Sequence, residues 1–278
     1  GCHEPHRVYK KGIGAASGKR LDRIVVPPFL PDTIEVRSDL ADYLTEIEHF
    51  DLHLGRMLDL LSRTGELDNT IVVATGDNGM SFPGAKATMK DFGWHVPMAV
   101  MAKGHFRGGR VSDDLVSFTG LAPAFLEAAG APRPAGQTGR SVLPLLRSAR
   151  SGVIDAGFNA VYAGRERHSH SRRDNLGYPA RAIRTREYLY IRNFQPSRWM
   201  AGDPPSFHDI DDGPTKQWMM AHRDASAVKP LFDAAFGKMP AEELYNVRLD
   251  PGCLRSLAGE QPRVAGELSA RLMGELRR

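Results

Sequence analysis

The sequence predicts an α/β fold, and three observations carry this prediction. Apolar residues recur at three- and four-residue spacing from Leu40 to Leu61, which is typical of an amphipathic helix. A short apolar run at 71–74 follows this helix at once and has the length and composition of a strand. A second apolar run, at 96–101, predicts the next strand. A helix followed directly by a strand is typical of layered α/β architectures.

The elements before the first strand are a loop and one long helix. Residues 7–23 are rich in Gly, Lys and Arg and are predicted to form an exposed loop. Residues 25–31 contain three prolines, which excludes a central strand or the interior of a helix. Asp32 is a suitable N-cap for the helix that follows, and Gly65 is a suitable stop.

The run Ile71-Val72-Val73-Ala74 is the stretch around which the chain is organised. Its branched apolar residues suit a strand covered on both faces, as in a parallel sheet. Asp77 and Asn78 follow at its carboxyl end, where sites form in such sheets. Carboxylate and amide oxygens suit Ca²⁺ or Mg²⁺ better than zinc. Asp-Asn-Gly is also good turn chemistry, and on spacing alone a plain turn is favoured by about two to one.

The second half of the chain alternates between predicted elements and loops. Residues 118–130 have the pattern of a helix with a glycine stop. Residues 160–164 are predicted to form a strand, and the segments 178–184 and 187–192 have the alternation of a β-hairpin. A long loop is predicted at 198–213, and a last helix at 264–276.

The segment 69–88 resembles the sulfatase family of the alkaline phosphatase superfamily, and within it the heparan N-sulfatases (N-sulfoglucosamine sulfohydrolases). In that family an apolar strand ends in Asp-Asn-Gly, continues through Phe-Pro and brings a basic residue to the sulfate. Three further stretches resemble family motifs in the same order: His3-Glu4-Pro5-His6-Arg7, the proline-rich stretch 26–33, and Glu243-Leu244-Tyr245-Asn246 with Asp250-Pro251. The resemblance therefore covers essentially the whole chain.

The resemblance implies a fold and a division into domains. Residues 1–176 would form part of an α/β alkaline-phosphatase-like sulfatase core. Residues 177–278 would form a small C-terminal α+β subdomain built on an antiparallel sheet.

The resemblance also implies roles for individual residues. Asp77 and Asn78 match metal ligands, while Lys86 and His6 match catalytic residues that contact the sulfate. His168 is the candidate for substrate binding, together with Arg165 and Glu166. Taken alone, a loop histidine such as His6 is more often a surface residue, by about three to one. The joint occurrence of these residues in the family order supports the functional interpretation.

The cofactors that the resemblance implies are Ca²⁺, with Mg²⁺ as the alternative, and a formylglycine nucleophile. Formylglycine arises from the Cys or Ser of a Cys/Ser-x-Pro-x-Arg motif, and this motif does not occur in the 278 residues. We therefore expect the chain to be the C-terminal portion of a sulfatase. The nucleophile and a pair of metal-binding aspartates would lie upstream, and the chain alone would be inactive.

The expected activity is hydrolysis of a sulfate ester or sulfamate on a sulfated carbohydrate. One alternative is a phosphodiesterase or phosphonate hydrolase of the same superfamily, although Asn78 in place of a histidine favours calcium over zinc. Another alternative is a protein that binds sulfated glycans without catalysis. The sequence leaves the location of the protein open, and the resemblance favours an exported or lysosomal protein.

Composition excludes some partners. Of the residues, 41% are apolar and 25% are charged, and the net charge is +4. The charges are dispersed without a long Lys/Arg run, so nucleic acid is not an expected partner. No run of about 18 apolar residues predicts a membrane span. Cys2 and Cys253 lack a metal-binding spacing, and the sequence leaves open whether they pair.

Overall fold

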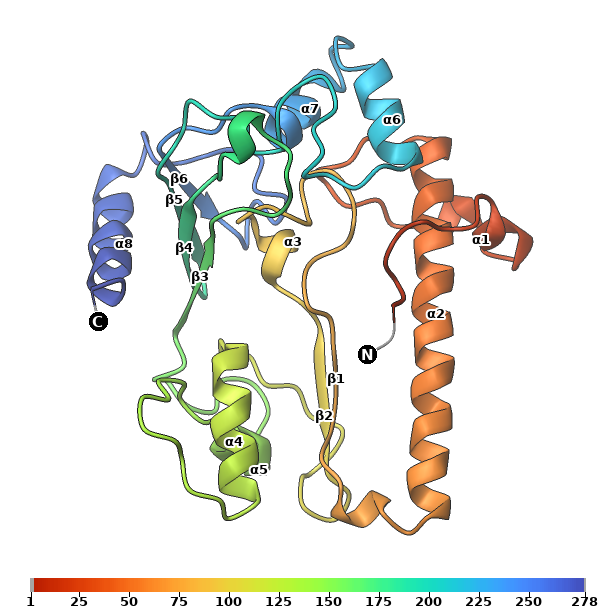
Figure 1. Cartoon of the computed structure of the whole chain (residues 1–278), viewed down its shortest axis with the longest axis vertical. Coiled ribbons are helices and arrows are strands. Elements are labelled where there is room, and N and C mark those ends of the chain that lie inside the picture. Colours follow the sequence, from red (N-terminus) through yellow and green to blue (C-terminus); the bar gives the residue numbers. More distant parts are fainter. Residues whose placement is uncertain (1–2, 278) are drawn as a thin grey trace.

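The computed structural model describes residues 3–277. The long helix α2 (Ile34–Arg63) runs along one side, the strands β1 (Val72–Thr75) and β2 (Met98–Met101) lie in the middle, and a second sheet lies on the far side (Figure 1). The other helices are α1 (Ile13–Ala16), α3 (Asp91–Trp94), α4 (Leu121–Ala128), α5 (Leu143–Arg147), α6 (Pro214–Ala221), α7 (Lys229–Phe236) and α8 (Pro262–Glu275). The other strands are β3 (Ala160–Arg165), β4 (Ala180–Thr185), β5 (Tyr188–Asn193) and β6 (Glu242–Asn246).

Helix α2 confirms the predicted long helix but not its predicted cap. Thr33 is the N-cap, and its side chain accepts a hydrogen bond from the Val36 amide at 3.4 Å. Asp32 instead forms an ion pair with Arg37, which accounts for the wrong assignment. Near the start of α2, Val36, Leu40 and Ala41 are buried, whereas Leu52 and Leu60 farther along are exposed.

Strands β1 and β2 were correctly located, but the expected parallel pairing is wrong for them. They pair with each other in antiparallel register, with Val72 opposite Met101 and Val73 opposite Val100. Their side chains are half-buried or exposed rather than covered on both faces. A chain that turns back through a loop containing only α3 can make this antiparallel contact without a crossover helix.

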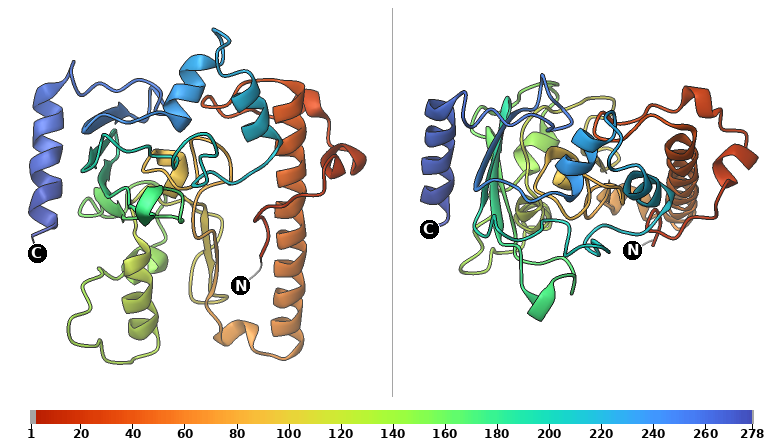
Figure 2. Two further views of the ribbon diagram at one scale, coloured as in Figure 1. Left: turned by 45° about the horizontal axis from the view of Figure 1, so that its top comes forward. Right: turned by 90° about the horizontal axis from the view of Figure 1, so that it is seen from above.

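The second sheet contains four antiparallel strands in the order β3-β4-β5-β6. The predicted hairpin is confirmed as β4 and β5, with Ile183 opposite Tyr190. Helix α8 covers one face of the sheet (Figure 2). Leu268 and Leu272 of α8 belong to the same core cluster as Ile183 and Tyr190. β3 belongs to this sheet although it precedes residue 176, so the sheet draws on both predicted domains; the boundary itself stays a prediction.

Several helices differ from the sequence prediction, among them α1, which lies within the stretch 7–23 that was expected to be an exposed loop. Helices α6 and α7 were not predicted, and both begin with proline in the first turn. They pack with α2 and the 24–30 loop around Phe207 and Phe236, forming the apolar core nearest to the candidate site. The stretch 111–116 holds only an isolated bridge between Ser112 and Gly152.

Cys253 is a buried free thiol, and burial raises its pKa to about 12. Cys2 lies outside the described residues. None of the helices within residues 3–277 has the length and apolar composition needed to cross a bilayer.

Candidate functional site

The loop that follows β1 is shaped by a glycine that admits no side chain. The Gly79 amide donates to the Gly93 carbonyl at 2.9 Å, and a Cβ on Gly79 would stand 1.8 Å from the Phe92 carbonyl oxygen. The Lys86 amide then donates to the Met80 carbonyl at 3.1 Å, which closes the loop on itself. Lys86 is thereby held in a compact, buried turn rather than on a free surface.

Lys86 joins three segments that are far apart in the sequence. Its side chain is only 9% exposed, and its Nζ donates to Asp211 Oδ2 at 2.8 Å. The same Nζ lies 3.3 Å from Nε2 of His6. The structure therefore brings together the two predicted catalytic residues, His6 and Lys86, and adds a carboxylate that the sequence did not indicate.

The hydrogen bonds of His6 define its tautomer. Nδ1 lies 2.6 Å from the Arg7 carbonyl oxygen, which can only accept, so Nδ1 carries the proton. In the neutral ring Nε2 is then an acceptor and can receive a hydrogen bond from the Lys86 ammonium. The imidazole thus presents Nε2 to the site with a fixed orientation.

Arg7 fixes the turn that carries His6. Its guanidinium makes two hydrogen bonds to the Asp39 carboxylate, at 2.9 and 2.8 Å, and a third to the Ser81 carbonyl at 2.9 Å. Asp39 on α2 also accepts from the amide and hydroxyl of Thr215 on α6. The Arg7–Asp39 ion pair is almost fully buried, with the two side chains 5% and 1% exposed. One ion pair therefore links the His6 turn, the Lys86 loop and two helices.

His168 lies on the loop after β3 and remains exposed. Partial burial of its imidazole lowers its pKa below the ordinary value of 6.5, and the charge of Lys86 acts in the same direction. Asp209 and Asp211 act in the opposite direction. His168 is therefore neutral at neutral pH and lies within electrostatic range of the Lys86–Asp211 pair.

Arg165 and Glu166, the two other predicted substrate contacts, have partners within the chain. Arg165 is nearly buried, and its guanidinium bonds the Asp209 carboxylate at 2.5 Å and the carbonyl oxygens of Ala87 and Met200. Burial lowers the pKa of Arg165 to about 10. Glu166 is exposed and forms an ion pair with Arg181. A substrate contact for either residue stays a prediction.

Asp77 and Asn78 lie at the end of β1, as predicted, and both are exposed. Within residues 3–277 no hydrogen bond or ion pair engages either side chain, so their oxygens are free to bind a cation. Hard oxygen donors suit Ca²⁺, which takes six to eight of them. Among the described residues no group of three His, Cys, Asp or Glu residues is arranged to hold a metal. These two residues therefore fit part of a calcium site.

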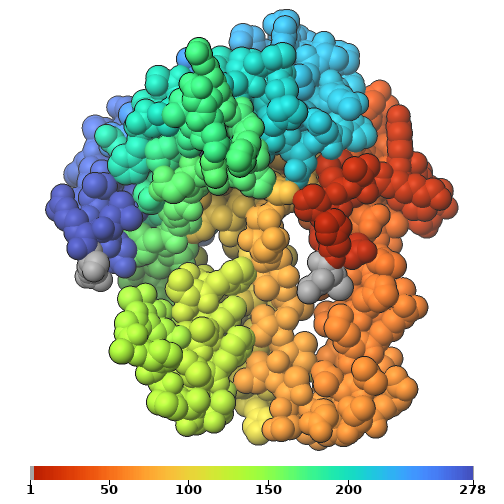
Figure 3. Space-filling view, in the orientation of Figure 1, coloured from red at the N-terminus to blue at the C-terminus, as the bar shows by residue number. Residues whose placement is uncertain are grey.

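Asp77 also borders a wide groove. This groove has a volume of about 700 Å³ and lies between the β1–β2 pair and the α4–α5 region, where the surface is deeply hollowed (Figure 3). Its walls include apolar side chains of both parts, such as Val100 and Leu146.

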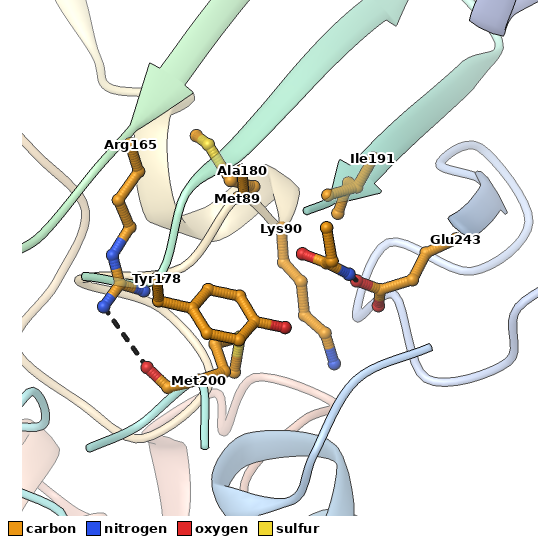
Figure 4. A pocket seen from close by; sticks show the side chains of 9 residues that line it. Met89, Lys90, Arg165, Tyr178, Ala180, Ile191, Met200 and Glu243 are labelled. Carbon is orange, nitrogen blue, oxygen red and sulfur yellow. Dashed lines mark hydrogen bonds between the residues drawn. The ribbon is translucent and has the colours of Figure 1, made fainter. Parts of the chain in front are cut away.

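A second, enclosed cavity lies behind Arg165 and is too small for a sugar. Its volume is about 10 Å³, enough for about one water molecule. Lys90, Tyr178 and Glu243 point into it (Figure 4). Burial lowers the pKa of Lys90 and raises that of Tyr178, whose hydroxyl has no hydrogen-bond partner among the described residues. This cavity is part of the core rather than a substrate site.

Asp211 is the site residue that sequence reasoning missed. It lies in the loop 198–213, which the sequence identified only as long and partly acidic. Its contact with Lys86 spans 125 positions in the sequence, and no local pattern reports such a contact.

The chain is similar in sequence to a protein family and to known sulfatases. Residues 2–131 match the family model described as Sulfatase. Human N-sulphoglucosamine sulphohydrolase is 29% identical over 180 residues, which is 61% of this chain and 34% of that protein. An ulvan-active sulfatase of Formosa agariphila is 30% identical over 215 residues, 76% of this chain and 37% of that protein.

The fold of this chain also resembles the folds of solved structures. One, described as a complex with its substrate D-glucosamine-2-N,6-O-disulfate, has a TM-score of 0.62 at 22% identity. The likeness covers 89% of this chain and 43% of that one. The chain thus spans between a third and a half of the length of these relatives.

Proposed function

We propose that the protein containing this chain hydrolyses sulfate esters or sulfamates on a sulfated sugar, because residues 2–131 match the family model described as Sulfatase. The observation that carries the proposal is the contact between Lys86 and His6. A buried ammonium and an oriented imidazole, brought together from distant segments, form a preorganised site for a sulfuryl group.

The residues of this chain can perform distinct parts of the reaction. The Lys86 ammonium would stabilise negative charge on the sulfuryl oxygens as the bond to the sugar breaks. His6 Nε2, which lies 3.3 Å from Lys86 Nζ, would hold or release a proton at the leaving-group atom. The exposed His168 would contact the sugar.

The family generally uses Ca²⁺ and formylglycine, and this chain offers part of the calcium site. Asp77 and Asn78 would supply a carboxylate and an amide oxygen. Bound there, Ca²⁺ would neutralise charge on a sulfate oxygen. We infer that the nucleophile belongs to a part of the protein outside these 278 residues, because the sequence holds no Cys/Ser-x-Pro-x-Arg motif.

The names of relatives support a glycosaminoglycan-type substrate. One relative is an N-sulphoglucosamine sulphohydrolase, and one structural neighbour is described with a disulfated glucosamine as its substrate. We propose a sulfated hexosamine as the substrate of this protein.

The test is release of inorganic sulfate by the full-length protein. N-sulfated and O-sulfated glucosamines are incubated with protein in Ca²⁺, after removal of Ca²⁺ by a chelator, and after Ca²⁺ is restored. We expect release that is lost on chelation and recovered with Ca²⁺. Hydrolysis of a phosphate diester or phosphonate instead, or sugar binding without sulfate release, would contradict the proposal and favour one of the two alternatives.

A further inference from the structure

Asp211 is the unexpected member of the Lys86 cluster. A sulfate group that binds to Lys86 would come close to the Asp211 carboxylate, whose Oδ2 lies 2.8 Å from Lys86 Nζ. Like charges brought together in this way weaken anion binding. A carboxylate at a sulfate site therefore needs a second role that offsets this repulsion, such as accepting hydrogen bonds from the part of the substrate that carries no negative charge.

The loop around Asp211 is fixed on both sides by buried polar contacts. On one side Asp209 is 1% exposed and binds two guanidinium groups, those of Arg165 and Arg172. Burial alone would raise the pKa of Asp209, but these two cations together with Ser169 bring it below the ordinary value. The carboxylate of Asp209 is therefore ionised and anchors the loop.

On the other side, the loop is held by a buried lysine. Lys216 Nζ donates to the carbonyl oxygens of Phe207 and Ile210, at 3.1 and 2.8 Å, and its side chain is 2% exposed. Gly213 lies against the Arg7 guanidinium so closely that a Cβ there would be 2.3 Å from Nη1. Asp211 is thus positioned by the fold before any ligand arrives.

Asp211 also has free capacity to bind a ligand. Its side chain is 21% exposed, compared with 9% for Lys86. Oδ2 accepts from Lys86, while Oδ1 has no hydrogen-bond partner among the described residues. A carboxylate has about four acceptor positions, so Oδ1 can receive a donor from a sugar.

We propose that Asp211 is a specificity residue that accepts a hydrogen bond from the nitrogen of an amino sugar at the sulfated position. This inference rests on the proposed function. In a sulfate ester the bridging oxygen carries no hydrogen, whereas the bridging nitrogen of a sulfamate carries one. Hydrolysis breaks the S–N bond and forms an S–O bond: R–NH–SO₃⁻ and H₂O give R–NH₃⁺ and SO₄²⁻. The ammonium product would then lie beside the Asp211 carboxylate, which favours a cation.

The test compares two substrates in the full-length protein and its Asp211→Asn variant. Asparagine keeps the shape of the side chain and removes its charge. We expect kcat/KM for N-sulfoglucosamine to fall by about tenfold or more, because a charge-assisted hydrogen bond is lost. We expect kcat/KM for 4-nitrophenyl sulfate, which lacks the nitrogen, to rise, because the carboxylate that repels the sulfate has been neutralised. Asp224→Asn is the matched control. Asp224 is 94% exposed, so this substitution removes the same charge at a position on the surface.

A second readout does not depend on turnover. Calorimetry measures the binding of glucosamine and of glucose to the full-length protein and to the Asp211→Asn variant. We expect the unmodified protein to prefer glucosamine and the variant to lose this preference. If the unmodified protein released no sulfate from any sugar, the proposed function would fall, and this binding comparison would still decide the role of Asp211. An equal loss of kcat/KM for both substrates, or an unchanged preference for glucosamine, would overturn the inference.

Discussion

Replacing Lys86 by alanine is expected to lower kcat of the full-length protein by about 10²–10³-fold, the usual cost of removing one preorganised donor from a developing oxyanion. The physical reason is burial: the ammonium is 9% exposed and lies between His6 and Asp211. A charge fixed in this environment interacts with a sulfuryl group more strongly than it would in water. The loss is measured as the rate of sulfate release at saturating substrate.

The control for this prediction is Lys103→Ala. Lys103 is 60% exposed and pairs with Asp68 on the surface, so its loss removes the same charge without touching the site. Its activity should match that of the unmodified protein. Thermal unfolding of both variants checks that the fold is intact. Equal activity of the Lys86→Ala and Lys103→Ala variants would show that Lys86 does not act on the substrate.

Replacing Arg7 by alanine is expected to reduce the free energy of unfolding by about 3–5 kcal/mol, because the buried Asp39 carboxylate is left without its cation. Both side chains are nearly inaccessible to water, at 5% and 1% exposure. The guanidinium also packs over the rings of Tyr9 and Phe82, at 4.4 and 4.6 Å from the ring centroids. Denaturant unfolding of the full-length protein measures the change.

Two further variants separate this ion pair from a general effect of charge. Arg20→Ala removes a guanidinium that is 67% exposed and pairs with Asp22, and it should leave the unfolding midpoint nearly unchanged. The double variant Arg7→Ala/Asp39→Ala should lose less stability than the sum of the losses of the two single variants. Each single variant leaves one buried charge unpaired, whereas the double variant leaves none. Strict additivity would contradict the assignment of Arg7 and Asp39 as a coupled pair.

Local patterns predicted much of the fold. The α/β sulfatase fold, which the family resemblance implied, is confirmed. The long helix, the β4–β5 hairpin and the last helix are also confirmed, because each of these three elements depends on a periodicity within one segment. The direction of pairing between β1 and β2 was not predicted, because an apolar run is the same in either direction. The N-cap was misplaced by one residue, since Asp32 and Thr33 are both good capping residues and only the ion pair of Asp32 with Arg37 distinguishes them.

The candidate site was predicted less completely. His6 and Lys86 were predicted because a family motif contains each of them, and the structure brings their side chains into contact. Asp211 and the buried anchors Asp209 and Lys216 were not found, because each acts through partners on other segments. A carboxylate in an acidic loop has the same local sequence whether it faces water or a buried lysine.

A crystal structure of the full-length protein with Ca²⁺ and inorganic sulfate would show whether His6, Lys86, Asp77 and Asn78 belong to one sulfate-binding site. We expect a sulfate oxygen at about 3 Å from Lys86 Nζ, the distance of a charge-assisted hydrogen bond. We also expect a cation bound by the oxygens of Asp77 and Asn78. Sulfate bound elsewhere, with Lys86 contacting only Asp211 and with no cation at Asp77, would show that these residues do not form one site.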